Sequence, residues 1–292
     1  DEVSVFNTEL SASDVTSLYN SGTPTTLPSG AVAHYRMGEE ANFTNNWLIN
    51  NSALSNYSTR SFEFDGVDDQ IDLPDIPFLR GGGQHFSISV WVLTTHTTQA
   101  GFFAARVAPS STNLIRLFRN TNRQAVLEIK SSSTGDIQIR SSNNSLTTNN
   151  WHHIVATFDG TQAAAADRVN MYIDGVLDNA YQTGTGTNLP SGTSGIMNFI
   201  GRTFLGLRQT GLIDELAIFN TTLSSSDVTT IYNSGVPSSI TSLSPFAHWR
   251  LGEEATFSTN WTIPDQVGSS DGTSSNMDLS DLVGDAPNYT GA

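Results

Sequence analysis

Residues 151–160 read Trp-His-His-Ile-Val-Ala-Thr-Phe-Asp-Gly, and residues 168–175 read Arg-Val-Asn-Met-Tyr-Ile-Asp-Gly. Apolar side chains recur with a period of about two in both stretches, which is typical of β-strands in a sheet that buries one face. Each stretch ends in Asp-Gly, which supplies the positive φ angle of a tight turn. The two stretches therefore predict strands that end in tight turns.

The same pattern extends to both sides of this pair. Strands are predicted at 87–92, 113–118, 125–129, 136–139 and 212–219, and further Asp-Gly turns at 65–66 and 271–272. The polar residues are mainly Ser, Thr, Asn and Gly, whereas the chain is poor in the residues that fill helices. Ten or more short strands predict an all-β fold, a two-sheet antiparallel jelly-roll sandwich.

One short helix is predicted after the last strand. Ser224-Ser-Ser-Asp227 resembles a capping box, with Ser224 as the N-cap and Asp227 near the positive end of the helix dipole. Val228, Ile231 and Tyr232 form an apolar stripe, and Gly235 is expected to end the helix. Residues 11–22 repeat this capped turn, so we expect one short C-terminal helix per unit.

The chain contains an internal repeat. Residues 1–22 match residues 214–235, residues 33–41 match residues 247–255, and Trp47 corresponds to Trp261. The offset is 213 residues at the start and 214 at the end. Self-similarity of this kind predicts a tandem array of units of about 200 residues.

The repeat predicts the domain organisation. Residues 1–22 are interpreted as the C-terminal strand and helix of a preceding unit, residues 31–235 as a complete domain, and residues 246–292 as the N-terminal part of a following unit. Residues 23–30 and 236–245 are interpreted as linkers because they are rich in Pro, Ser and Thr.

Composition excludes several classes of function. There are 28 acidic and 13 basic residues, and the net charge of −15 argues against nucleic acid and anionic lipid as partners. No apolar run approaches the roughly 18 residues of a membrane-inserted helix. The absence of Cys excludes disulfides, thiolate metal sites and Cys nucleophiles.

Four segments together resemble the laminin G-like, concanavalin A-like lectin/glucanase family. They are residues 33–39, residues 61–69, residues 151–160 with 171–175, and residues 211–219, in the order and spacing of that family. The resemblance implies a non-catalytic adhesive jelly roll, often calcium-assisted and glycan-binding, in an extracellular, cell-surface or virion protein. It also implies that a first strand near 33–38 shares a sheet with the closing strand at 212–219.

The sequence argues against glycan hydrolysis. Glucanases that are related to this family carry a Glu-x-Asp-x-x-Glu strand, which places an acid and a nucleophile beside the scissile bond. The chain has no such run, and Asp214-Glu215 lacks both flanking carboxylates. We therefore expect no enzymatic activity.

Five acidic residues are candidate calcium ligands. Asp65, Asp68 and Asp69 cluster at a predicted tight turn, and calcium prefers several oxygen ligands. The resemblance makes the first and last strands neighbours, so we expect Glu39 and Asp214 close by. The alternative is that Asp65 caps the turn, Asp214 binds backbone amides and the others are solvated.

Two further kinds of surface site can be named. Aromatic platforms for a glycan are candidates at Trp47, Trp91, Trp151, Trp249 and Trp261, of which Trp91 and Trp151 fall inside predicted strands and are expected in the core instead. N-glycosylation sequons begin at Asn42, Asn50, Asn56, Asn143, Asn220, Asn260 and Asn288. Their number is close to that expected by chance from the composition, so it carries no signal by itself.

Two functions from different classes remain open. The first is a structural and adhesive unit of an extracellular fibre or virion appendage, in which the strand-like residues 1–10 of one copy pair head-to-tail with residues 246–252 of the next. The alternative is a calcium-assisted, lectin-like module of a surface adhesin that binds surface glycans. A longer polyprotein that continues at both ends is equally compatible with the repeat.

Overall fold

The computed structural model describes residues 3–19, 31–35, 42–43, 47–48, 58–107, 112–193, 196–204, 206–237 and 239–287. The chain divides into two compact units, residues 1–57 and residues 58–292. Within the described part of the chain, no helix has the length and apolar character that crossing a membrane requires.

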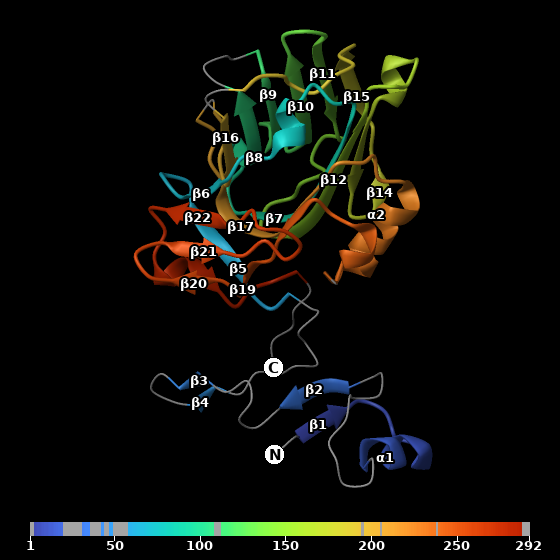
Figure 1. Ribbon diagram of the computed structural model, residues 1–292, viewed down its shortest axis with the longest axis vertical. Coiled ribbons are helices and arrows are strands. Elements are labelled where there is room, and N and C mark those ends of the chain that lie inside the picture. Colours follow the sequence, from blue (N-terminus) through green and yellow to red (C-terminus); the bar gives the residue numbers. More distant parts are fainter. Residues whose placement is uncertain are drawn as a thin grey trace. The chain divides into compact units, whose positions relative to one another are not determined.

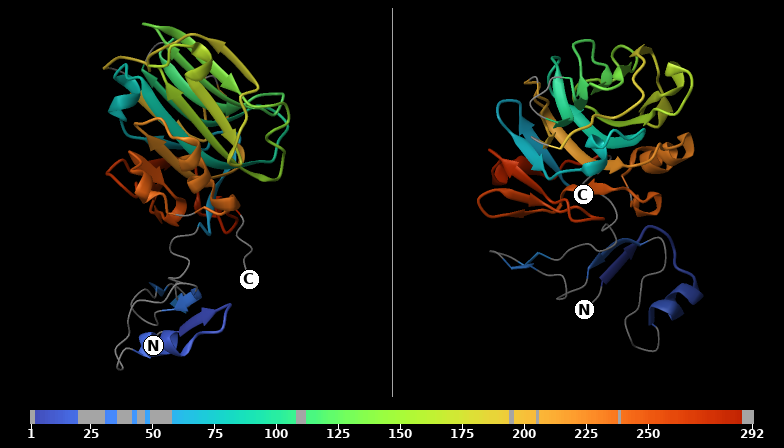
Figure 2. Two further views of the ribbon diagram at one scale, coloured as in Figure 1. Left: turned by 90° about the vertical axis from the view of Figure 1, so that its right-hand side faces the viewer. Right: turned by 45° about the horizontal axis from the view of Figure 1, so that its top comes forward.

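The larger unit is a sandwich of two antiparallel sheets (Figures 1 and 2). The eight-stranded sheet has the order β14 (Val176–Leu177), β13 (Val169–Ile173), β12 (Trp151–Asp159), β7 (His85–Thr94), β17 (Thr210–Phe219), β5 (Ser61–Asp65) and β23 (Leu282–Val283), and β18 (Ala247–Trp249) also pairs with β17.

The ten-stranded sheet has the order β15 (Tyr181–Gly184), β11 (Gly135–Arg140), β10 (Ala125–Ser131), β9 (Leu114–Arg119), β8 (Ala100–Val107), β16 (Ile196–Ile200), β6 (Gln70–Leu73), β22 (Gly272–Ser275), β21 (Trp261–Ile263) and β20 (Thr256–Phe257). The predicted all-β sandwich is therefore confirmed.

Alternation decides which side chains face the core. In β12, Ile154, Ala156 and Phe158 join the main core between the sheets, whereas Val155 points to the opposite face. Strand β8 was not predicted, because its sequence Ala-Gly-Phe-Phe-Ala-Ala-Arg-Val is apolar on both faces and does not alternate.

Helix α2 (Ser225–Tyr232) confirms the predicted cap. The Ser224 and Asp227 backbone N–H groups donate to the Asp227 carboxylate and the Ser224 hydroxyl, at 2.8 and 3.3 Å. Val228 and Ile231 are buried in a second apolar cluster on the outer side of the eight-stranded sheet. The left-handed residue that ends the helix is Asn233, with φ of 44°, rather than Gly235.

The partner of the closing strand differs from the sequence-based prediction. Strand β17 pairs with β18, with Leu216 opposite Trp249 and Ile218 opposite Ala247. The prediction gave this place to residues 33–38, the first copy of the same motif. Strand β2 (Ala31–Tyr35) pairs instead with β1 (Val3–Phe6) in the smaller unit.

The additional pairing of the second copy explains this choice. Beyond β18 and β19 (Leu251–Glu254), residues 256–283 add β20 to β23, of which β22 pairs with β6 and β23 pairs with β5. In the first copy, β5 begins soon after Trp47, so the sequence there has no residues that correspond to β22 and β23 of the second copy. The second copy therefore makes more backbone hydrogen bonds to the sandwich. The described part of the smaller unit contains β1, α1 (Ala12–Tyr19), β2, β3 (Asn42–Phe43) and β4 (Trp47–Leu48).

Candidate functional site

A buried carboxylate pair lies in the middle of β17. The register shifts between Asp214 and Ala217, and Glu215 adopts a positive φ of 47°, so two consecutive acidic residues are both buried. Asp214 accepts hydrogen bonds from the Ser58 hydroxyl at 2.5 Å and the Glu215 backbone N–H at 2.8 Å. Burial, followed by the charges of Glu215 and Glu253, raises the pKa of Asp214 well above its usual value.

Glu215 is paired with two residues of the neighbouring segment. His248 Nε2 lies 2.5 Å from one carboxylate oxygen, and Arg250 Nε donates to the other at 3.0 Å. Burial by itself raises the pKa of Glu215, but the hydrogen bond from His248 and the charges of His248 and Arg250 outweigh it, so the net pKa is lowered.

Glu253 extends this network to the start of the larger unit. One of its carboxylate oxygens accepts hydrogen bonds from the backbone N–H groups of Thr59 and Arg60, at 2.6 and 3.0 Å. Gly252 makes this approach possible, because a Cβ atom there would lie 2.7 Å from the Arg60 Cβ. The network therefore ties β17, β18–β19 and residues 58–60 together.

The predicted calcium ligands fall into two separate groups. Asp65, Asp68 and Asp69 have carboxylate oxygens within 4.8 Å of one another. Asp214 belongs to a second group with Glu215 and Glu253, and Glu39 lies outside the described residues. Glu253 is the repeat counterpart of Glu39. A glutamate of the predicted motif therefore lies near Asp214, but it belongs to the second copy of the motif.

The second group does not fit a metal ion. His248 and Arg250 already compensate Glu215, and Glu253 is occupied by backbone donors. The raised pKa of Asp214 favours its neutral form, which is a poor calcium ligand. This network is best explained as a structural clamp.

The first group differs from the second because, among the described residues, no Lys, Arg or His forms an ion pair with Asp65, Asp68 or Asp69, and a pKa of about 6 leaves Asp69 ionised at pH 7. The Asp65 carboxylate caps the turn by accepting the backbone N–H groups of Val67 and Asp68, at 2.7 and 3.2 Å. Asp69 is only 4% exposed, and burial together with the charges of Asp65 and Asp281 raises its pKa to about 6. Like charges crowd at this turn, and a hard cation with carboxylate and water ligands would offset them.

A separate group of polar and aromatic residues occupies the outer face of the ten-stranded sheet. We call it the arginine–aromatic face. It consists of Arg106, Arg116, Phe118, Glu128, Gln138, Arg140, Tyr181, Phe199, Arg202 and Phe204, and its strands β8 to β11, β15 and β16 are labelled in Figure 1. Each of its four arginines lies over an aromatic ring, with guanidinium carbon to ring centroid distances of 4.3 to 4.9 Å.

A continuous hydrogen-bonded row crosses this face. Arg116, Glu128 and Gln138 are direct cross-strand neighbours on β9, β10 and β11. Arg116 Nε donates to Glu128 at 2.5 Å, Gln138 Nε2 donates to Glu128 at 3.2 Å, and Arg140 Nε donates to Gln138 Oε1 at 2.7 Å. The row ends at Tyr181, which is 50% exposed.

The candidate aromatic platforms at Trp249 and Trp261 are wrong, whereas the burial of Trp91 agrees with its place inside a predicted strand. Trp91, Trp249 and Trp261 are 3%, 0% and 4% exposed, because they pack into the interior or under α2. Trp151 is half-buried at the start of β12, and nothing is described of the Trp47 side chain.

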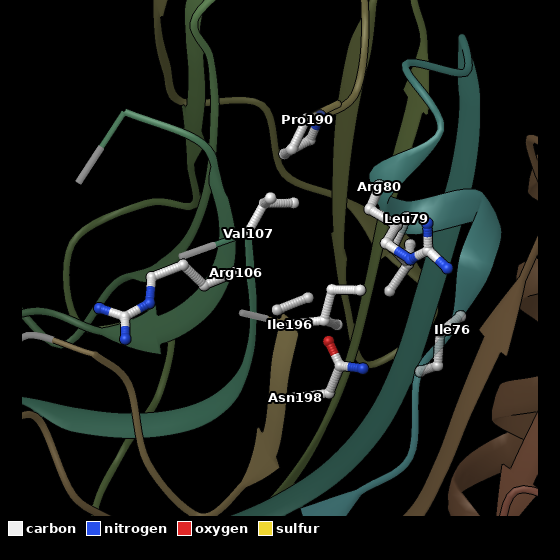
Figure 3. Close-up of a pocket in the computed structure, with 9 residues that line it drawn as sticks. Ile76, Leu79, Arg80, Arg106, Val107, Pro190, Ile196 and Asn198 are labelled. Carbon is white, nitrogen blue, oxygen red and sulfur yellow. The ribbon is translucent and has the colours of Figure 1, made fainter. Parts of the chain in front are cut away.

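A small pocket lies beside this face, between the 3₁₀ turn Pro77–Arg80 and strands β8 and β16 (Figure 3). Leu79, Val107 and Ile196 line it, and the Arg106 guanidinium points away from these side chains (Figure 3). Asn198 already donates to the Pro74 carbonyl at 2.7 Å, and the lining is mainly aliphatic. The pocket therefore offers a sugar few hydrogen-bonding groups.

The sequons can be placed in part. Asn143, Asn220 and Asn260 are exposed. Asn50, Asn56 and Asn288 lie outside the described residues, as does the side chain of Asn42. Glycosylation stays a prediction.

Sequence reasoning missed the residues of the arginine–aromatic face. A signal was present, because Arg116, Glu128 and Gln138 occupy outward positions of three predicted strands. What the sequence does not give is the order of these strands, which places the three side chains side by side.

A two-sheet jelly roll with a capped helix after its closing strand defines the class of this protein. The profile of the Concanavalin A-like lectin/glucanases superfamily matches residues 65–229, which is more than half of the chain. The chain therefore belongs to this superfamily. No curated protein matches the sequence.

Three of the solved structures that match this chain are compared with it by their identity, coverage and TM-score. The heptameric SAP-like pentraxin of Limulus polyphemus is 10% identical, with 60% of this chain and 82% of that chain covered and a TM-score of 0.46. The Ruminococcus gnavus IT-sialidase CBM40 bound to α2,3 sialyllactose is 11% identical, with 60% and 98% covered and a TM-score of 0.47. Domain 4 of the Geobacillus stearothermophilus arabinanase AbnA is 23% identical, with 59% and 76% covered and a TM-score of 0.43.

Proposed function

We propose that the larger unit is a non-catalytic carbohydrate-binding module and that the arginine–aromatic face is its binding surface. The observation that carries this proposal is the row from Arg116 to Arg140, which ends at the half-exposed ring of Tyr181. The row presents planar polar groups in fixed positions beside an aromatic ring.

The chemistry of sugars matches this arrangement. A pyranose ring has an apolar face that packs on an aromatic ring and hydroxyl groups that need several oriented hydrogen-bonding partners. In the described part of the chain, the row uses the Nε atoms of Arg116 and Arg140, and we infer that their terminal Nη groups donate to a ligand. Side chains that are already fixed also lose less conformational entropy when a ligand binds.

Charge favours acidic sugars over neutral ones. The arginine–aromatic face carries four arginines and one glutamate in a chain whose net charge is −15. Arginine binds carboxylates and sulfates in a planar, bidentate manner, so acidic glycans gain more from this face. A location outside the cell or on its surface is part of the same proposal, because glycans of this kind are exposed there.

Calcium is proposed at the Asp65 turn, away from the row. Asp65, Asp68 and Asp69 would supply carboxylate oxygens, and the ion would stabilise the connection between β5 and β6.

A glycan microarray tests the proposed function. The whole chain is compared with a variant that carries Arg140→Met and Tyr181→Ala, and with Arg80→Met as a matched control. Arg80 pairs with Asp75 and is not part of the arginine–aromatic face. We expect the chain and the control to bind a common set of glycans, and the double variant to lose at least tenfold in affinity, about 1.4 kcal/mol. Equal binding by all three proteins would assign recognition to another surface.

Head-to-tail assembly into a linear array is a second candidate function. The specific observation in its favour is that β1 and β2 pair in the same way as β17 and β18. Strand pairing between copies would then link the domains.

A further inference from the structure

Strand β1 exposes side chains whose counterparts are fully buried. Val3 and Val5 are 47% and 48% exposed, whereas the matching Leu216 and Ile218 of β17 are both 0% exposed in the main core. The two pairs of strands nevertheless share one register. Val5 lies opposite Ala33, and Ile218 lies opposite Ala247.

Helix α1 shows the same contrast. Val15 is 54% exposed, whereas its counterpart Val228 of α2 is 0% exposed in the second apolar cluster. Tyr19 is 69% exposed, whereas the matching Tyr232 stacks on Trp91 at a ring-centroid distance of 5.8 Å. Residues 3–19 therefore retain side chains that suit a jelly-roll interior.

The two segments that pair with these closing strands share most of their contact residues, while the buried Trp249 and Leu251 correspond to Tyr35 and Met37. In the larger unit the contacts of the second segment depend on Ala247, His248, Arg250, Gly252, Glu253 and Trp261. The first segment has identical residues at the corresponding positions, Ala33, His34, Arg36, Gly38, Glu39 and Trp47. Its sequence therefore contains the groups that bind to β17 and to residues 58–60.

We propose that these two segments exchange between copies of the chain, an inference that rests on the head-to-tail assembly proposed above. In the exchanged state, β2 pairs with β17 of its own chain, and the released β18 pairs with β1 of a second copy. Each chain has two closing strands and two pairing segments, so every strand keeps one partner of the same register. The contact is head-to-tail, and domain swapping through it generates a linear array when the rotation between successive copies does not close a ring.

Concentration decides between the two states. The closed state keeps both pairings within one chain, where the effective concentration of the partner is high. It also keeps the pairing of β22 with β6 and of β23 with β5. The population of the exchanged state rises when the concentration of chains is high and when β18 has separated from β17.

Disulfide trapping tests the proposal, because the chain has no cysteine of its own. Direct cross-strand partners lie within the distance that a disulfide spans. The variant Val5→Cys/Ala247→Cys reports the exchanged pairing, and Val5→Cys/Ala33→Cys reports the closed pairing. The single variant Val5→Cys controls for collisions between exposed thiols. Each whole-chain variant is refolded from denaturant over a hundredfold range of concentration and oxidised.

We expect Val5→Cys/Ala247→Cys to form trimers and longer covalent ladders whose yield rises with concentration. Val5→Cys stops at dimers, because it carries one thiol. Two results overturn the proposal. One is that Val5→Cys/Ala247→Cys forms nothing longer than the single variant does, while Val5→Cys/Ala33→Cys closes within the chain. The other is that the disulfide of Val5→Cys/Ala247→Cys forms only within single chains.

Discussion

The replacement Trp249→Ala tests which copy of the repeated segment completes the larger unit. Trp249 is 0% exposed in the main core, and its indole N–H donates to the Ser270 carbonyl at 2.8 Å. Removing a fully buried tryptophan side chain costs about 3–5 kcal/mol, and the Ser270 carbonyl loses its partner as well. One kcal/mol lowers the Tm of a domain of this size by roughly 2–4 °C. We therefore expect the Tm to fall by about 6–20 °C.

Tyr35→Ala is the matched control, because Tyr35 occupies the same position in the first copy. Differential scanning calorimetry of the whole chain measures both variants at neutral pH. We expect Tyr35→Ala to leave the main transition within about 1 °C of the unchanged chain, since β2 pairs with β1 in the other unit. A large loss from Tyr35→Ala with little effect of Trp249→Ala would refute the assignment of residues 246–287 to the larger unit.

Three further predictions concern the clamp, a buried histidine and the acidic turn. Gly252→Ala is expected to lower the free energy of unfolding in urea by about 2–4 kcal/mol, because its Cβ would lie 2.7 Å from the Arg60 Cβ and 3.0 Å from the Arg60 carbonyl carbon. The control Gly284→Ala should be neutral, since nothing lies within 4 Å of a Cβ atom there. Burial lowers the pKa of His153 to about 3, so protonation favours the unfolded state. The free energy of unfolding should therefore fall by about 1.4 kcal/mol per pH unit as the pH drops from 6.5 towards 3. The same slope in His153→Gln would contradict this prediction. The pKa of Asp69 is raised to about 6, so its protonated form is favoured in the fold and its contribution to stability is lost as the pH rises from about 4 to 6. Calcium should therefore raise the Tm more at pH 7 than at pH 5. The absence of a calcium-induced Tm shift in the unchanged chain, or the same shift in Asp69→Asn, would exclude the proposed site.

Local sequence signals predicted the elements of this fold well. Alternation located β7, β9 to β13 and β17, and Ser224 with Asp227 located α2, because these signals depend on neighbouring residues. Pairing between distant strands was harder to predict. The choice of partner for β17 depends on β22 and β23, which lie far along the chain and have weak patterns of their own.

The candidate sites show the same limit. Proximity in sequence brought Asp65, Asp68 and Asp69 together as expected. The glutamate predicted beside Asp214 was assigned to Glu39, since two copies of one motif cannot be told apart by sequence. The row from Arg116 to Arg140 depends on the neighbouring positions of β9, β10 and β11, which only the sheet topology reveals.

Hydrogen–deuterium exchange with a bound glycan tests the central claim most directly. The whole chain is saturated with an oligosaccharide selected on the microarray, and amide exchange is compared with that of the free chain. Carbohydrate binding at the arginine–aromatic face predicts slower exchange in peptides that cover residues 114–140 and 181–184, with no change in α2 or in β12 to β14. Protection confined to the eight-stranded sheet, or no protection anywhere at saturation, would contradict the account.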